Sequence, residues 1–347
     1  MALLCKEMKS KSIENMVFCV ESIGKNSLYS TKTKIIVSKV SSGLKLSFLS
    51  EIYTVIKESD ANIVHVWLPA VISIPGMFFA KTLGKKVVFS FRNRMFFHRL
   101  LSYPEFLCAL FFSDQIVSNH EISDSNKLYK WLYKIKNGVV INNGVNIGKY
   151  KRRKRIVKGK KTIRFIYVGR LTEQKNPIKL LKALSLVKDC NWILDIYGEG
   201  TLKNELVKLV EYYKMSGSVF FYEFSDCIYS KMVNADALLF PSRYEGTPNV
   251  LIEAMSMRLP VLASFIEANK RVVGSLPGFY WLNPDDAEDM SETIESFLKD
   301  YDDTDFFHLL RRCELIAQRY SAKSMVSKYE KLYLKILGES VKNEVTH

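Results

Sequence analysis

Short apolar runs rich in β-branched and aromatic residues alternate with amphipathic segments along the whole chain. In the segment 41–57, apolar residues recur at Leu44, Phe48, Ile52 and Ile56, a spacing that puts them on one face of a helix. Alternation of strands with helices predicts two parallel-sheet α/β domains. The predicted strands are 16–20, 34–40, 63–67, 86–91, 115–118 and 139–141 in the first half, and 163–168, 192–197, 218–222, 237–241, 260–263 and 278–282 in the second.

A length of 347 residues suits two domains better than one core. The turn signal Asn142-Asn143-Gly144 is followed by the basic run 151–161, which suits neither core and marks a boundary. We therefore predict a first domain at 1–145, a basic linker at 146–161 and a second domain at 162–320. A terminal helix and tail should occupy 321–347.

The net charge of +15 is unevenly distributed along the chain. Residues 1–150 carry a net +10 and residues 151–161 add eight basic groups, whereas the remaining 186 residues sum to −3. The first half should therefore meet an anionic partner: a phospholipid surface, a phosphorylated lipid or a nucleic acid. The run 151–161 is either a membrane-facing segment or a solvated linker.

Cysteine spacing and hydropathy exclude several classes of protein. The six cysteines are scattered without a CxxC pair, so zinc ribbons and disulfide scaffolds are disfavoured and a reducing cytosol is indicated. The longest run without charged residues, 61–80, contains Pro69 and Pro75 and is better explained by a strand, a turn and a short helix than by a membrane span. We expect a cytoplasmic protein that touches the membrane from that side.

The stretch 237–263 is the most informative for chemistry. A buried strand should end near Pro241, a loop should carry Glu245 and Gly246, and a helix should begin with Thr247 as its N-cap and Pro248 as its first residue. Ligands of open α/β sheets bind at the carboxyl ends of strands, where free N–H groups at a helix start favour phosphate. Gly246 would allow a ligand to approach the backbone closely.

Two carboxylates flank this predicted helix start. Glu245 lies in the loop and Glu253 on the second helical turn. A carboxylate accepts hydrogen bonds from a vicinal diol, so the pair could hold a sugar at one end of a diphosphate and a ribose at the other. Spacing alone also allows two surface carboxylates near a helix start.

Cations and glycines follow two other predicted strands. Arg170 and Lys175 come after the strand that ends at Gly169, and suit a diphosphate; solvated loop charges are the equal alternative. Gly198 and Gly200 follow the next strand, but the full GxGxxG fingerprint is absent. A dehydrogenase is therefore disfavoured.

The order of these motifs resembles glycosyltransferase family 4, whose members are retaining, nucleotide-sugar-dependent enzymes of the GT-B fold. The resemblance covers about 140–345 and rests on Gly169-Arg170, Lys175-Asn176-Pro177, Tyr197-Gly198-Glu199-Gly200, Glu245-Gly246 with Glu253, and Pro260-Val261. It implies two Rossmann-like domains facing a cleft, with a C-terminal helix. The first half resembles the family more loosely, through 62–65 and 113–117.

The resemblance also implies roles for these residues. Arg170 and Lys175 would hold the diphosphate and stabilise it as it leaves, and Glu245 would face the donor sugar. Glu253 would accept from the ribose hydroxyls. The donor-binding set would be completed by Gly169, Gly198, Gly246, Thr247, Pro248 and Asn249.

No metal or other cofactor is expected, because the two cations and the helix start would take the electrostatic role of a metal. No Asp-x-Asp pair follows a predicted strand, and Asp285-Asp286 should start a helix. The expected donor is a nucleotide diphosphate sugar, UDP rather than GDP. The expected acceptor is a lipid-diphosphate-linked saccharide of surface polysaccharide assembly. The protein would reach it as a peripheral enzyme on the inner face of the membrane.

Three features depart from the family. The family's opening strand and glycine-rich loop are not found before Met1–Lys11, which resembles the helix that normally follows them; either the sequence starts too late or the first domain is abbreviated. Arg92 or Asn93 stands where many members have a histidine near the reacting sugar. Arg258-Leu259 replaces a small residue and glycine, and the segment Phe265–Asn269 lacks the usual Gly-Glu element.

Other functions remain open at this point. A nucleotide-sugar epimerase or hydrolase on a similar scaffold would need no acceptor, and a non-catalytic relative would turn nothing over. Nucleic-acid binding ranks last, because no recognition motif is present. The segment 92–112 combines three arginines with a broad apolar face and is either a membrane-lying or a buried helix.

Overall fold

The computed structural model describes residues 4, 16–19, 34–37, 46–67, 74–91, 103–119, 127–147, 162–188, 191–223, 225, 227–301 and 305–338. The chain divides into two compact units, one formed by 1–144 with 322–347 and the other by 145–321. Most of the predicted linker, from 148 to 161, and the expected first helix apart from Leu4 lie outside the described residues.

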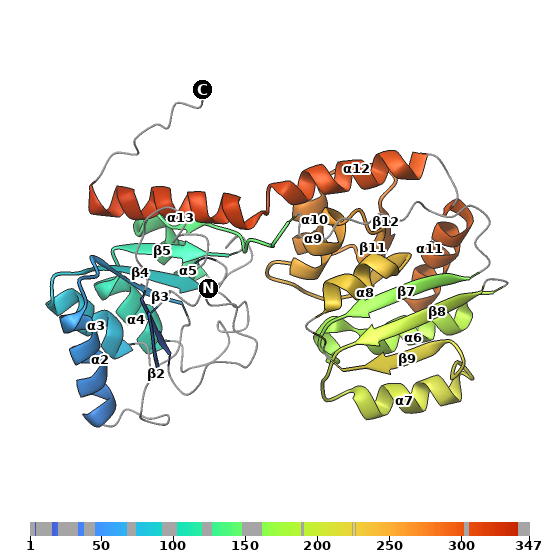
Figure 1. The fold of residues 1–347 in the computed structure, drawn as a ribbon, viewed down its shortest axis with the longest axis horizontal. Coiled ribbons are helices and arrows are strands. Elements are labelled where there is room, and N and C mark those ends of the chain that lie inside the picture. Colours follow the sequence, from blue (N-terminus) through green and yellow to red (C-terminus); the bar gives the residue numbers. More distant parts are fainter. Residues whose placement is uncertain are drawn as a thin grey trace. The chain divides into compact units, whose positions relative to one another are not determined.

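The first unit is built on a parallel sheet in the order β3-β4-β5-β6, with β1 and β2 forming a separate parallel pair. Helices α2, α3, α4 and α5 contribute to one core cluster on this sheet. Helix α13 covers the other face, through Met325, Val326, Tyr329 and Leu332 (Figure 1). The elements are β1 (Met16–Cys19), β2 (Lys34–Val37), β3 (Ile63–Val66), β4 (Lys86–Phe91), β5 (Gln115–Ser118), β6 (Val139–Val140), α2 (Leu46–Glu58), α3 (Ile74–Thr82), α4 (Tyr103–Phe112), α5 (Lys127–Ile135) and α13 (Ala322–Leu337).

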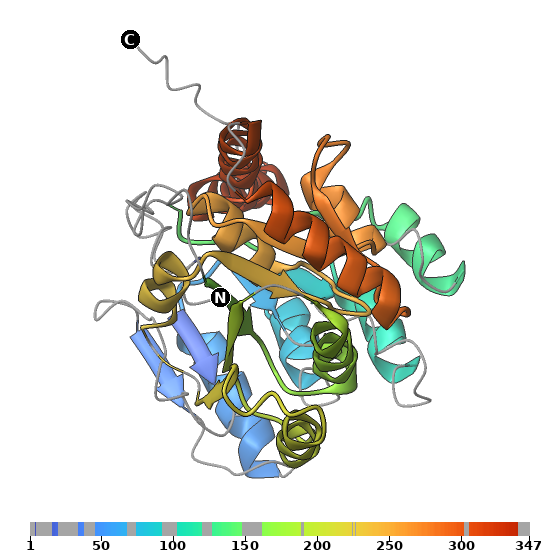
Figure 2. The ribbon, with the colours of Figure 1, turned by 90° about the vertical axis from the view of Figure 1, so that its right-hand side faces the viewer.

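The second unit contains a six-stranded parallel sheet in the order β12-β11-β10-β7-β8-β9. Helices cover both of its faces (Figures 1 and 2). The strands are β7 (Ile163–Val168), β8 (Trp192–Tyr197), β9 (Val219–Tyr222), β10 (Ala237–Phe240), β11 (Val261–Ser264) and β12 (Tyr280–Leu282). The helices are α6 (Pro177–Leu186), α7 (Lys203–Tyr212), α8 (Ile228–Asn234), α9 (Asn249–Ser256), α10 (Glu267–Val273), α11 (Ala287–Asp300) and α12 (Asp305–Gln318), with a 3-10 turn η5 (Glu173–Lys175).

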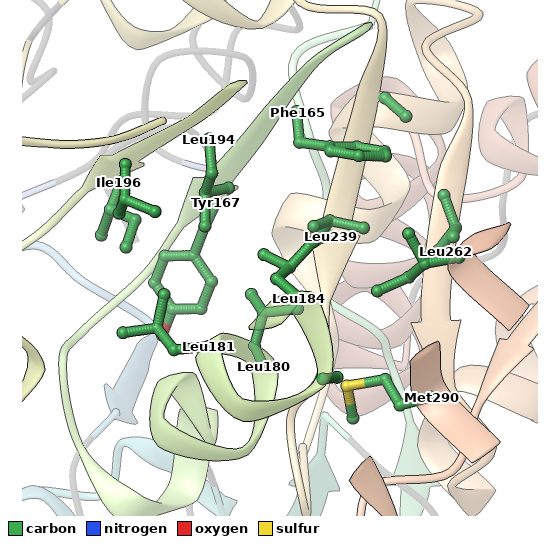
Figure 3. Packing of buried hydrophobic residues seen from close by; sticks show 14 of the residues in the cluster. Phe165, Tyr167, Leu180, Leu181, Leu184, Leu194, Ile196, Leu239, Leu262 and Met290 are labelled. Carbon is green, nitrogen blue, oxygen red and sulfur yellow. The ribbon is translucent and has the colours of Figure 1, made fainter. Parts of the chain in front are cut away.

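The central strand β7 is buried on both faces. Phe165 and Tyr167 point to the core that α6, α7 and α11 cover, as Figure 3 shows. Ile166 and Val168 point to the opposite core, which α8, α9, α10 and α12 cover. Strands buried on both faces read as continuous apolar runs rather than as an alternating pattern, which explains the sequence of β7 and of β10.

The predicted fold class is confirmed, because both units are parallel-sheet α/β structures and the last described element is a helix. Each of the twelve predicted strands is present, with bounds that differ by at most three residues. The predicted helix start at Asp285-Asp286 is also confirmed. The Asp286 side chain accepts hydrogen bonds from the backbone N–H groups of Glu288 and Asp289, at 2.8 and 3.3 Å.

Candidate active site

The candidate catalytic side chains lie at the carboxyl ends of the two central strands of the second unit. Arg170 and Lys175 follow β7, and Glu245 follows β10, which pairs with β7 in parallel. Parallel neighbours end at the same edge of a sheet, where ligands of open α/β folds bind. The two stretches that the sequence singled out therefore meet at one edge.

Lys175 and Glu245 form a buried ion pair. Lys175 Nζ lies 2.5 Å from Glu245 Oε1, and the two side chains are 15% and 7% exposed. The same ammonium lies 5.2 Å from the centre of the Phe240 ring, within range of a cation–π interaction. The structure thus holds one cation and one carboxylate, shielded from water, at the strand edge.

Gln174 connects the two loops that carry the pair. Its side-chain amide donates to the carbonyl of Tyr244 at 3.0 Å, and its backbone carbonyl accepts from the N–H of Arg243 at 2.9 Å. Arg170 Nη2 donates to Gln174 Oε1 at 3.0 Å. Arg170 is therefore linked through Gln174 to the loop that follows β10, and its side chain remains exposed to solvent.

Asn176 is a positioning residue that the sequence reasoning quoted but gave no role. It is buried, and its φ of 55° lies in the left-handed region, which asparagine tolerates better than most residues. Its amide nitrogen donates to the carbonyls of Pro241, at 3.2 Å, and Pro284, at 2.8 Å. These bonds fix Asn176, the neighbour of Lys175 in the chain, against the ends of β10 and β12. The available signal was an asparagine placed directly before a proline that opens a helix.

The glycines of the expected donor-binding set have two different surroundings. A Cβ atom at Gly198 would lie 1.9 Å from the carbonyl oxygen of Gly169, so Gly198 allows the loops after β7 and β8 to pack closely. At Gly246 a Cβ atom would meet nothing within 4 Å. Gly246 therefore borders open space beside Glu245.

The start of helix α9 corrects the sequence prediction. The helix begins at Asn249, Pro248 is its N-cap, and Thr247 lies one residue outside it. The reason is the ψ of 73° at Pro248, which is not helical, so the proline precedes the first helical residue instead of occupying it. Asn249 is exposed, and its backbone N–H group donates to the carbonyl of Thr247 at 2.9 Å.

Glu253 lies on the second turn of α9, as predicted, but it is far from a surface carboxylate. Burial raises the pKa of its carboxyl group from 4.5 to about 7, while a hydrogen bond from Tyr229, at 3.0 Å, acts in the opposite direction. Tyr229 belongs to α8 and was not identified from the sequence, because no motif connects the two helices. The carboxyl group is thus held where it titrates near neutral pH.

The segments that depart from the family's sequence pattern contain a cation–π contact and a buried amide. Arg92 and Asn93 lie outside the described residues. After β11, Phe265 is exposed and Lys270 Nζ lies 4.8 Å from its ring centre. Asn269 is fully buried; its amide nitrogen donates to the carbonyl of Ser264 at 2.9 Å, whereas its Oδ1 has no hydrogen-bond partner among the described residues.

The described residues contain neither a cluster of metal-ligating side chains nor a helix that could span a membrane. They contain no group of three or more His, Cys, Asp or Glu side chains arranged to hold a metal ion. None of their helices combines the length and the apolar character that crossing a bilayer requires.

The fold and this edge define a class of protein. Residues 149–312 match the family model described as glycosyl transferases group 1. Over its length the structure resembles that of Alr3699/HepE from Anabaena in complex with UDP and glucose, with a TM-score of 0.75, 14% identity and coverage of 96% of this chain and 94% of the other. A glycosyltransferase from Rickettsia africae gives a TM-score of 0.79 at 17% identity, with 97% and 94% coverage. The chain therefore has the GT-B fold.

Curated relatives match parts of the chain. An uncharacterized glycosyltransferase of Methanocaldococcus jannaschii is 33% identical over 111 residues, which are 31% of this chain and 27% of the relative. The amylovoran biosynthesis glycosyltransferase AmsD of Erwinia amylovora is 38% identical over 104 residues, 30% of each chain. The matched stretch spans less than a third of the length of either relative.

Proposed function

We propose that this protein is a retaining glycosyltransferase of family 4. It transfers a hexose or acetamidohexose from a nucleotide diphosphate sugar, UDP rather than GDP, to a lipid-linked saccharide of surface polysaccharide. The observation that carries the proposal is the buried Lys175–Glu245 pair at the ends of β7 and β10, beside the open space at Gly246. An ion pair sequestered at a ligand-binding edge is costly to build and indicates a role in binding or catalysis.

Each side chain has a task in this reaction. Lys175 and Arg170 bind the diphosphate and stabilise the negative charge that develops as it leaves. Glu245 orients the donor sugar, and the N–H groups of Gly246 and Thr247 face the phosphate and the sugar. The bond between the anomeric carbon and the diphosphate oxygen breaks while the acceptor oxygen bonds to the same face of that carbon. The acceptor proton passes to the departing phosphate.

Glu253 holds the nucleoside end of the donor in this account. As a carboxylate it accepts hydrogen bonds from the two ribose hydroxyl groups, and Tyr229 orients it. The pKa of about 7 means that the ionised and protonated forms are both populated at neutral pH. Donor hydroxyls that donate to the carboxylate favour the ionised form, so binding and ionisation support one another.

The proposed donor and acceptor follow from the named relatives. One, from Campylobacter jejuni, is an N-acetylgalactosaminyltransferase acting on a diphospho-undecaprenol-linked sugar, and is 30% identical over 134 residues. Another, from Escherichia coli, is a UDP-Gal:alpha-D-GlcNAc-diphosphoundecaprenol galactosyltransferase, 27% identical over 210 residues. The basic first half suits such an anionic lipid acceptor and supports the proposal of a cytoplasmic enzyme held peripherally on the inner face of the membrane.

The reaction is proposed to need no divalent metal, because Arg170 and Lys175 supply the positive charge that a metal would otherwise bring to the diphosphate. Turnover should then persist in EDTA and should not rise when Mg²⁺ or Mn²⁺ is restored. Activity that EDTA abolishes and either ion recovers would refute this part of the proposal.

The experiment that tests the proposal measures nucleotide release from a panel of UDP- and GDP-sugars, with and without a lipid-diphosphate-linked saccharide. A transferase releases nucleotide rapidly only when the acceptor is present, and release should be lost in Glu245→Gln. Release that is independent of the acceptor would indicate a hydrolase. Epimerised donor without release would indicate an epimerase, and no turnover of any donor a non-catalytic relative.

A further inference from the structure

The outer face of α5 combines lysines with large apolar side chains. Lys127, Lys130 and Lys134 are exposed, and Trp131 and Ile135 are 50% and 46% exposed. These positions recur at helical spacing on one side of α5. On its other side Leu132 is completely buried in the core of the first unit. The exposed face is therefore the one that the fold leaves uncovered.

A second apolar pair lies on the neighbouring crossover helix. Leu107 and Phe111 of α4 are 48% and 69% exposed and stand four residues apart on that helix. Both α4 and α5 pack against the same core cluster, α4 through Ala109. Helices α4 and α5 together present four large apolar side chains to solvent.

The charge around α5 favours an anionic partner. Helix α5 carries Lys127, Lys130 and Lys134 and no Asp or Glu, and Lys136 follows it directly. A helix lying in a membrane interface typically has lysine on its polar face and tryptophan with aliphatic residues on its apolar face. Tryptophan in particular prefers the level of the lipid head groups. A nucleic acid would use the charge but not the aliphatic side chains.

We propose that the α4–α5 face of the first unit, formed by Leu107, Phe111, Trp131, Ile135 and the three α5 lysines, docks on an anionic lipid bilayer. Trp131 and Ile135 enter the interface, while Lys127, Lys130 and Lys134 bind lipid phosphates. This inference rests on the proposed function, whose membrane partner it assigns to a defined surface. It assigns the contact to a folded helix, independently of the basic run 151–161.

The test uses the full chain and vesicles that contain no saccharide. Co-sedimentation is measured with vesicles of phosphatidylglycerol and phosphatidylcholine and with phosphatidylcholine alone. Lys127→Gln/Lys130→Gln/Lys134→Gln should bind anionic vesicles about two orders of magnitude more weakly than wild type, since each lysine near such a surface contributes roughly fivefold. Trp131→Ala/Ile135→Ala should also bind weakly, at unchanged circular dichroism.

Two controls separate this face from a general charge effect. Lys208→Gln/Tyr212→Ala removes one exposed lysine and one exposed aromatic residue from α7 in the second unit and should bind like wild type. Trp131 is one of four tryptophans. The blue shift of tryptophan fluorescence on vesicle addition should therefore disappear in the conservative variant Trp131→Phe, which should still sediment with anionic vesicles.

Several results would overturn the proposal. They are wild-type binding by both α5 variants, equal binding of wild type to neutral and anionic vesicles, and a self-associated wild type that Trp131→Ala/Ile135→Ala converts to monomer without loss of vesicle binding. The outcome is separable from the proposed function. Sugar transfer to a water-soluble acceptor without vesicle binding would sink the docking face alone, and vesicle binding without any transfer would sink the proposed function alone.

Discussion

The Lys175 ammonium and the Glu245 carboxylate, 70 residues apart in sequence, lie 2.5 Å apart at the ends of β7 and β10. Neither motif by itself distinguishes a binding site from solvated loop charges. Their pairing in a buried position excludes solvated loop charges for these two residues and supports the proposed site, because removing two charges from water is costly. The following predictions test this pair and the residues that position it.

Removing one member of the pair should destabilise the protein more than removing both. Lys175→Met leaves Glu245 buried without its cation, so we expect a loss of roughly 3–5 kcal/mol in the free energy of unfolding. The double variant Lys175→Met/Glu245→Gln should recover much of this loss in urea denaturation, whereas transfer should stay absent in both variants. The exposed pair Lys81–Asp114 provides the control, since Lys81→Met should cost less than about 1 kcal/mol. Equal losses in the free energy of unfolding for Lys175→Met and Lys81→Met would contradict the burial of the Lys175–Glu245 pair.

Glu253 should make donor binding depend on pH. Its pKa of about 7 predicts that donor affinity rises as the pH increases through 7, because only the carboxylate accepts from both ribose hydroxyls. Tyr229→Phe removes a hydrogen bond that lowers this pKa, so its affinity profile should shift to higher pH and approach wild type near pH 8.5. Calorimetric titration with the donor between pH 5.5 and 8.5 measures the affinity profiles of wild type and of Tyr229→Phe. A profile that is flat, or unchanged in Tyr229→Phe, would exclude Glu253 from the donor contact.

The Glu253 carboxyl group should also make the folded protein less stable as the pH rises, whereas it makes donor binding stronger. Its pKa is raised in the folded state, so the folded protein retains this proton between about pH 4.5 and 7 while the unfolded chain releases it. Its contribution to the free energy of unfolding is therefore present at low pH, falls by about 3 kcal/mol between about pH 4.5 and 7, and levels off above 7. Glu253→Gln should consequently be more stable than wild type at pH 8, and the difference should vanish near pH 4.5.

Gly246 should be required for ligand binding but not for folding. Added methyl groups at Gly246 and at Gly217 meet nothing within 4 Å, so Gly246→Ala and Gly217→Ala should both keep wild-type melting temperatures. Only Gly246→Ala should weaken donor binding, because its methyl group enters the space beside Glu245. Gly198→Ala should instead lower stability, since its methyl group would collide with the Gly169 carbonyl. Wild-type donor affinity in Gly246→Ala would place the donor elsewhere.

Asn176 should act through both its backbone and its amide group. Asn176→Gly keeps the left-handed conformation but loses the bonds to Pro241 and Pro284, whereas Asn176→Ala loses both features. The alanine variant should therefore be about 1 kcal/mol less stable than the glycine variant. Both should show reduced transfer, because Lys175 is the adjacent residue. If glycine restored full activity, the amide bonds would have no part in positioning Lys175.

How far the sequence predicts this structure differs between elements. The runs 163–168 and 192–197 coincide with β7 and β8, because strands covered on both faces leave an unmistakable apolar signal. The predicted start of α9 is wrong by one residue. Thr247 and Pro248 have the residue types of an N-cap and a first helical residue, but the helix begins only at Asn249. The backbone angle of Pro248 decides between them only in the folded chain.

The sequence predicts the charged residues of the candidate site but not the residues that position them. Glu245, Glu253, Arg170 and Lys175 stand in recognisable order along the chain. Tyr229, in contrast, contacts Glu253 from a different helix, and a contact of this kind depends on how two helices pack. The raised pKa of Glu253 is likewise a consequence of burial, which residue spacing does not reveal.

The central claim is that the Lys175–Glu245 edge transfers a sugar with retention to a lipid-linked acceptor. It is tested most directly by supplying a UDP-sugar labelled with ¹³C at its anomeric carbon, together with a lipid-diphosphate saccharide, and recording the NMR spectrum of the lipid fraction. The account predicts a labelled glycoside with the anomeric configuration of the donor, formed by wild type and absent with Glu245→Gln at unchanged fold. Inverted configuration, label recovered only as free sugar, or wild-type product yield from Glu245→Gln would contradict it.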